Sequence, residues 1–130
     1  MESLKFNVKE MAAILKMVKA MIMADGVVDS NEKNFLGYLL HNLGINENDP
    51  VIFYLSDAME FDIAIATIKN MSSSQKRYFT AYLGVMIAID EDIDKEEVAL
   101  WKMISILCNL PTMTINEAVK EAHEYMIAKN

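Results

Sequence analysis

The chain is poor in several residue types, and each shortage excludes a class of protein. It has one cysteine in 130 residues, so neither an internal disulfide framework nor a cysteine-based zinc site is available. Its four glycines form no phosphate-binding motif. A chain with a single cysteine suits a reducing compartment, and we expect the protein to be cytoplasmic.

Basic residues are also scarce. Twelve lysines and arginines face 19 acidic residues, for a net charge of −7, and only one residue is arginine. Nucleic-acid binding depends on clustered basic side chains, so we expect no nucleic-acid partner. The longest near-continuous apolar run, at 78–89, has 12 residues, which is short of the about 20 that span a bilayer. Residues 1–9 carry scattered charges and no apolar run, so we expect no signal peptide there. We therefore expect no membrane insertion.

Apolar residues are abundant, at 53%, and follow helical spacing along the whole chain. No strand pattern interrupts them. A length of 130 residues suits one domain, since domains typically have about 100–150 residues. The sequence therefore predicts a single all-α domain over residues 1–130, built as a bundle of about seven helices.

The expected helices can be placed from their apolar spacing and their capping residues. Asn7 is suited to cap the first helix and Gly26 to follow its last turn. Thr114 and Glu117 have the spacing of a capping box, and one of the serines at 72–74 should cap the fifth helix. We expect the other helices over about residues 30–43, 60–70, 75–89, 95–109 and 114–128, with a short one opening at Pro50.

The sequence repeats weakly at an offset of half the chain. Residues 20–45 align with residues 85–110, and five of the 26 aligned positions are identical. We interpret this as two helix–loop–helix halves placed around a pseudo-two-fold axis. The identical pairs are Met21/Met86, Ile22/Ile87, Asp25/Asp90, Asp29/Asp94 and Glu32/Glu97.

Three of these five pairs are acidic and share the spacing Asp-x-x-x-Asp-x-x-Glu. Residues 25–32 hold three acids and no base, and residues 90–97 hold six acids and one base. The remaining chain is close to neutral, with 11 basic and 10 acidic residues. The negative charge of the protein is therefore gathered in two repeated segments.

Two interpretations of these acidic segments stay open. In the first, Asp29 and Asp94 cap the following helices, and the glutamates at 32 and 97 complete capping boxes. That interpretation leaves Asp25 and Asp90 unexplained, since both stand at the end of a helix, where the dipole disfavours a carboxylate. In the second, the carboxylates bind a divalent cation. Oxygen-only ligands suit Ca²⁺, Mg²⁺ or Mn²⁺. The predicted metal ligands are Asp25, Asp29, Glu32, Asp90, Asp94 and Glu97.

An EF-hand does not explain the second segment. Asp90, Asp92 and Asp94 match the first three ligand positions of an EF-hand loop. The sixth position, which requires glycine, is Lys95, and the twelfth, which requires glutamate, is Trp101. Any cation site here would have a different construction.

The string ADGVVDSNE, residues 24–32, resembles the signature of the tellurite-resistance TerB-like domain family. The second half departs from it, with Ile89 in place of alanine and Glu91 in place of glycine. The resemblance implies an all-α fold with two related halves, divalent-metal binding through the acidic residues above, a link to stress response and action through protein partners. A homodimer is among the partners that we consider.

We therefore expect a non-enzymatic cation-binding module, with a metal-free scaffold domain as the alternative. A hydrolase using metal-bound water is the least favoured reading. Other candidate groups have structural explanations: we expect Cys108 and Trp101 in the core and His41 at the surface. The eleven methionines should mostly fill the core, or else form an adaptable partner groove. The lysines of the first helix, Lys5, Lys9, Lys16 and Lys19, should form a solvated basic side.

Overall fold

A computed structural model of the chain describes residues 4–24, 30–45, 50–89 and 95–129, with the helical backbone alone for residues 30–32 and 126–129. Every secondary-structure element in this part of the chain is a helix, which confirms the predicted all-α bundle of about seven helices. The elements are α1 (Val8–Ile22), α2 (Ser30–Asn42), α3 (Pro50–Ala58), α4 (Phe61–Lys69), α5 (Ser73–Ala88), α6 (Lys95–Leu107) and α7 (Ile115–Lys129).

Among the helix starts that the structure describes, three have a reciprocal capping box, in which the cap and the third helical residue exchange hydrogen bonds. At α1 the Asn7 side chain accepts from the Glu10 backbone N–H at 2.8 Å, and the Glu10 carboxylate accepts from the Asn7 N–H at 2.9 Å. The predicted caps of α1 and α7 are confirmed, and Ser72 is the serine that caps α5. The three pairs are Asn7–Glu10, Ser72–Gln75 and Thr114–Glu117.

The end of α1 differs from the prediction. The helix ends at Ile22 with Met23 as its C-cap, before the predicted stop at Gly26, which lies outside the described residues. The last turn tightens there, because the Ala24 N–H donates to the Met21 carbonyl three residues back. Apolar spacing continues through such a turn and does not reveal where the helix ends.

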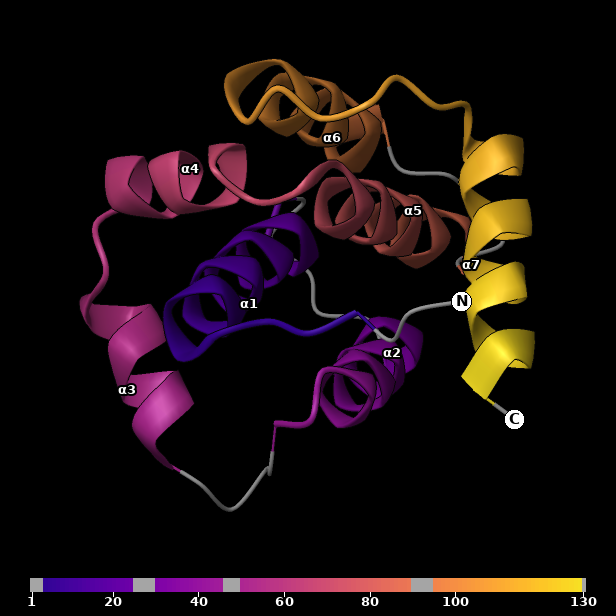
Figure 1. The fold of residues 1–130 in the computed structure, drawn as a ribbon. Helices are drawn as coiled ribbons and strands as arrows, with labels where there is room; N and C mark the ends of the chain where they lie inside the picture. The colour runs from indigo at the N-terminus through magenta and orange to yellow at the C-terminus, as the bar shows by residue number, and fades with distance from the viewer. Residues whose placement is uncertain (1–3, 25–29, 46–49, 90–94, 130) are drawn as a thin grey trace.

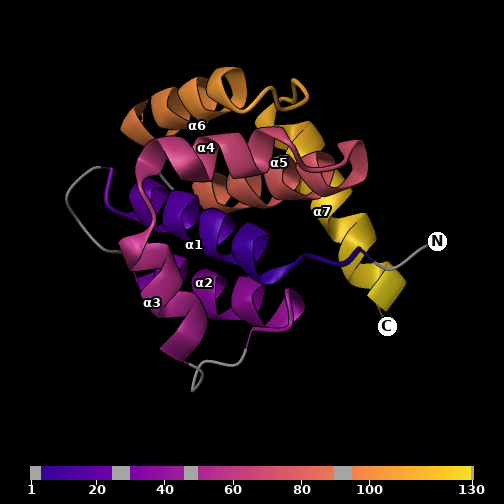
Figure 2. The same cartoon turned by 60° about the vertical axis from the view of Figure 1, so that its left-hand side comes forward.

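Helices α1 and α5 form the centre of the bundle. Figure 1 and Figure 2 show α3 and α4 packed on α1, and α6 and α7 packed beside α5. Helix α5 buries nine residues, more than any other helix described, as its nearly all-round apolar sequence predicts. Within the described part of the chain, no helix combines the length and the apolar character that crossing a membrane requires.

Aromatic rings join the N-terminal segment, α5 and α7. Tyr78 stacks on Tyr82 with ring centroids 4.5 Å apart, and Phe6 and Tyr125 tilt against Tyr78 at 5.6 and 5.1 Å. Burial raises the pKa of the Tyr78 hydroxyl above its usual value. The cluster therefore fastens both ends of the chain to the central helix.

The internal repeat extends further along the chain than the acidic motif. Helices α1, α2 and α3 begin at residues 8, 30 and 50, and α5, α6 and α7 begin 65 positions later in each case. Helices α2 and α6 also end at equivalent residues, Asn42 and Leu107. Helix α4 has no counterpart and connects the two halves.

The ends of α2 and α6 repeat in backbone geometry as well. Gly44 and Asn109, 65 positions apart, both have positive φ, of 80° and 53°. The next residue in each case is Ile45 or Leu110. Its N–H donates a hydrogen bond to the carbonyl oxygen of the residue five positions earlier, with an N···O distance of 2.8 Å. This is the Schellman arrangement, which closes a helix through a left-handed residue. The predicted helix–loop–helix halves thus share the same start and stop signals.

Candidate functional site

The acidic segments lie mostly outside the described residues. Asp25, Asp29, Asp90 and Asp94 are not described, and Glu32 is described only as a backbone position in the first turn of α2. The structure therefore neither assembles nor separates these predicted ligands. Glu97, in the first turn of α6, is the one whose side chain is described.

Glu97 is buried, with only 1% of its surface exposed. The glutamates at the same third position of α1 and α7, Glu10 and Glu117, are half-buried and exposed. A hydrogen bond from Thr114 lowers the pKa of the Glu117 carboxyl, as expected for an exposed capping glutamate. Burying an ionised carboxylate is costly unless donors or a cation compensate it. Glu97 is therefore distinguished from the ordinary capping glutamates of this chain.

Among the described residues, no three His, Cys, Asp or Glu side chains gather in a way that could hold a metal ion. The histidines His41 and His123 are both exposed, as predicted for His41. Cys108 and Trp101 belong to the core, at 0% and 5% exposure, which confirms their predicted structural roles. Burial raises the pKa of the Cys108 thiol to about 11, which disfavours the thiolate form at neutral pH.

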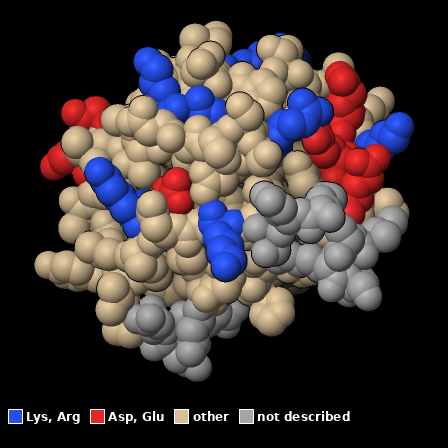
Figure 3. All heavy atoms as spheres, in the orientation of Figure 1, with Lys and Arg blue, Asp and Glu red and all other residues tan. Residues whose placement is uncertain are grey.

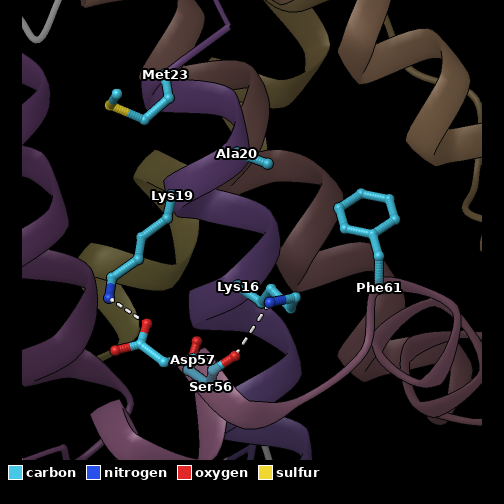
Figure 4. A pocket seen from close by; sticks show the side chains of 7 residues that line it. All are labelled: Lys16, Lys19, Ala20, Met23, Ser56, Asp57 and Phe61. Atoms are coloured by element: carbon cyan, nitrogen blue, oxygen red, sulfur yellow. Dashed lines mark hydrogen bonds and ion pairs between the residues drawn. The ribbon is translucent and has the colours of Figure 1, made fainter.

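The structure contains a cavity that the sequence reasoning missed. It has a volume of about 250 Å³ and lies between α1, the last turn of α3 and the start of α4. We call it the lysine cavity, and Figure 4 shows the side chains around it. Its lining residues are Lys16, Lys19, Ala20, Met23, Ser56, Asp57 and Phe61.

The two lysines reach from α1 to the C-terminal turn of α3. Lys16 Nζ donates to the Ser56 carbonyl at 3.2 Å, and Lys19 Nζ forms an ion pair with Asp57 at 3.4 Å (Figure 4). The Lys19 ammonium also lies 5.5 Å from the centroid of the Phe53 ring. Both lysines are half-buried and contact α3, whereas the sequence predicts only a solvated basic side for them. A helical pattern shows which residues share a face but not which helix packs over it.

Ser56 adds a polar group without a partner. It is 1% exposed, and its hydroxyl oxygen has no hydrogen-bond partner among the described residues. A buried unsatisfied polar group typically costs about 1–3 kcal/mol, so such a group in a native structure calls for an explanation.

The two halves of the protein differ at the lysine cavity. At an offset of 65, Lys16 corresponds to Ala81, Lys19 to Gly84 and Asp57 to Ala122, and all three counterparts are buried. A Cβ on Gly84 would lie 2.4 Å from the Ala118 Cβ, so α5 and α7 are in close contact. At these positions the second half therefore has small residues in close contact, whereas the first half has charged side chains and a cavity. The sequence signal that could have revealed the site is the replacement of small residues by charged ones when the repeat alignment is extended to these positions.

Charge is unevenly distributed over the surface. Figure 3 shows lysine side chains over α1 and acidic side chains gathered over α7. On α7, Glu121 accepts two hydrogen bonds from Arg77, at 2.5 and 2.9 Å. Basic and acidic side chains thus gather over different helices on this face of the protein.

Comparison with known proteins finds a relative among the solved structures. No protein-family model matches the chain, and no significant match is found among curated proteins. The chain is 40% identical to a protein of unknown function from Porphyromonas gingivalis with a solved crystal structure. The match covers 95% of this chain and 94% of the other, with a TM-score of 0.82. The protein therefore belongs to the same family as this P. gingivalis protein.

Proposed function

We propose that the protein is a non-enzymatic, TerB-like module that binds a divalent cation, Ca²⁺, Mg²⁺ or Mn²⁺, through its two acidic inter-helix segments. The observation that carries this proposal is the burial of Glu97 beside a segment of strongly negative sequence. The cation would join each helix pair and adjust a surface that protein partners contact. The link to partners and to stress response rests on the TerB-like resemblance.

Glu97 is more deeply buried than a capping role requires. A capping glutamate needs to reach only one backbone N–H at the helix start, and Glu10 and Glu117 do so without full burial. Residues 90–97 include five acids besides Glu97 and one base, Lys95, whose side chain is exposed. A divalent cation would offset both the burial of Glu97 and the mutual repulsion of its neighbours.

The structural repeat supports two sites of the same kind. Because α2 and α6 begin 65 positions apart, the acids of the first segment hold the same positions relative to their helix as those of the second. Hard cations select carboxylate oxygens by number and arrangement. A repeated arrangement therefore predicts two cations per chain.

A metal-free scaffold domain is the second candidate, and one observation favours it. Three other helices of this chain begin with a polar cap and a Glu or Gln three residues later, at Asn7, Ser72 and Thr114. The spacing from Asp29 to Glu32 and from Asp94 to Glu97 is the same. In this reading, the acidic residues stabilise helix starts without a ligand.

Thermal unfolding separates the two candidates. We expect millimolar Ca²⁺, Mg²⁺ or Mn²⁺ to raise the melting temperature above that in EDTA, because a ligand that binds only the folded state stabilises it. The Asp25→Asn/Asp90→Asn variant should lose this rise. Glu97→Gln should lose the part of the rise in melting temperature that comes from the second acidic segment. The control Glu117→Gln, at an exposed cap, should keep the whole rise. An unchanged melting temperature with all three cations would reject cation binding and leave the scaffold reading.

A further inference from the structure

We propose that the lysine cavity binds a small monocarboxylate with an apolar body, as a ligand separate from the cations of the acidic segments. Four observations carry this proposal: the charge of the lining, its apolar wall, the Ser56 hydroxyl and the difference between the two halves.

The charged lining favours a single negative charge. Lys16 and Lys19 bring two positive charges to the lining, and Asp57 brings one negative charge. The lining therefore has a net charge of one positive unit. The Ser56 carbonyl belongs to the last turn of α3, where the helix dipole is negative. This carbonyl and the Asp57 carboxylate repel a phosphate with two charges more strongly than a carboxylate with one, and a single negative charge is enough to neutralise the excess.

The rest of the lining favours an apolar body. Ala20, Met23 and Phe61 complete the cavity, and Met23 and Phe61 are 56% and 39% exposed. A ligand that covers these side chains removes apolar surface from water. The volume of about 250 Å³ lies below the usual range of about 300–1,000 Å³ for pockets that hold drug-sized ligands. The ligand should therefore be small, with a short alkyl or aryl group.

Ser56 supplies the donor that a carboxylate would use. Its buried hydroxyl has no partner among the described residues, although the residue lines the cavity. Rotation about the Cα–Cβ bond would present this hydroxyl to a carboxylate beside the Lys16 ammonium, which already contacts the Ser56 carbonyl. Hydrogen bonds to an ionised acceptor are stronger than neutral ones. Ligand binding would thus satisfy a group that the free protein leaves unsatisfied.

The second half shows how the same helix pair packs without a cavity. Ala81, Gly84 and Ala122 seal α5 against α7 at the positions of Lys16, Lys19 and Asp57. Small apolar residues at this contact pack closely and bury no charge. Natural proteins depart from such packing mainly at functional sites. At these described positions the first half has a charged opening and the second half does not, and a ligand of the first half explains this difference.

An NMR titration of the full chain tests the proposal, with sodium octanoate as the probe. The buffer contains EDTA, so that cation binding plays no part. We expect saturable shifts of the backbone amides at residues 16–23, 56–57 and 61. Octanol should bind at least about tenfold more weakly, and inorganic phosphate should cause no saturable shift at these residues.

Variants locate the binding. Lys16→Met and Lys19→Met should each weaken octanoate about tenfold, and Lys9→Met, on the same helix but outside the lining, should leave it unchanged. Ser56→Ala should also weaken octanoate while keeping or raising the melting temperature of the free protein, because it removes an unsatisfied group. If only one of these three lining variants folds, its octanoate binding can still be compared with that of Lys9→Met. The proposal is overturned if octanoate causes no saturable shift up to about 10 mM, if octanol or phosphate binds equally well, or if the lining variants bind octanoate like the wild type.

Discussion

Gln75 donates a hydrogen bond from Nε2 to Oε1 of Glu10 across 3.2 Å, although the two residues lie 65 positions apart. Each is the third residue of its helix and completes the capping box there. They are therefore equivalent residues of the two halves. Equivalent residues contact each other only close to the axis that relates them. The pseudo-two-fold axis predicted from the repeat would therefore pass near the starts of α1 and α5, the two central helices.

This contact should appear as a coupling between the two helix starts. Glu10→Ala removes a capping bond and the contact with Gln75, so we expect a loss of about 1 kcal/mol in the free energy of unfolding. Gln75→Ala should cost a similar amount. The double variant should lose about 0.5 kcal/mol less than the two single losses together, measured by chemical denaturation. Strict additivity would show that the two capping boxes act independently.

The close contact of α5 with α7 makes Gly84 sensitive to a single methyl group. A glycine-to-alanine change inside a helix normally stabilises by about 0.5–1 kcal/mol. At Gly84 the new Cβ would lie 2.4 Å from the Ala118 Cβ and 3.2 Å from the Trp101 ring, so we expect a loss of about 1–3 kcal/mol. Adding Ala118→Gly should recover part of the loss, apart from its own cost to α7. A more stable Gly84→Ala protein would contradict the close packing described here.

Burial of Cys108 predicts a pH dependence at the alkaline end. The pKa of the thiol is raised from 9.0 to about 11, so the unfolded chain loses this proton before the folded one. Stability should therefore be at its full value below pH 9 and fall as the pH rises toward 11, by up to about 1.4 kcal/mol for each unit by which the two pKa values differ.

The control for this prediction is Cys108→Ala. Its unfolding free energy should decline less between pH 9 and 10, while the decline above pH 10 remains, because the pKa of Tyr78 is also raised by burial. In the wild type, a thiol reagent at pH 8 should label Cys108 only at the rate of unfolding. Rapid labelling of the folded protein would mean that the thiol is accessible.

Local signals allowed most of the fold to be predicted from the sequence. Asn7 and Thr114 cap the helices predicted for them, and Trp101 and Cys108 lie in the core as the repeat alignment indicates. These features depend on residues three or four positions apart or on apolar spacing. The sequence predicted the end of α1 a few residues too late. The helix ends in a tightened turn, and no particular residue type indicates such a turn.

The candidate sites were only partly predictable. The burial of Glu97 depends on tertiary packing and does not follow from its spacing to Asp94. The contacts of Lys16 and Lys19 with α3 join residues about 40 positions apart, and helical periodicity contains no information on such pairs. A comparison of the two halves over their whole length, rather than over the acidic motif alone, would have shown that these lysines replace buried small residues.

Isothermal titration calorimetry of the full chain tests cation binding most directly. For the wild type, freed of metal with EDTA and then desalted, we predict saturable binding of two cations per chain by at least one of Ca²⁺, Mg²⁺ and Mn²⁺. Asp90→Asn should reduce the number to one, and Glu117→Gln should leave it at two. The absence of saturable heat with all three cations up to about 10 mM, confirmed by unchanged melting temperatures, would contradict the proposed function.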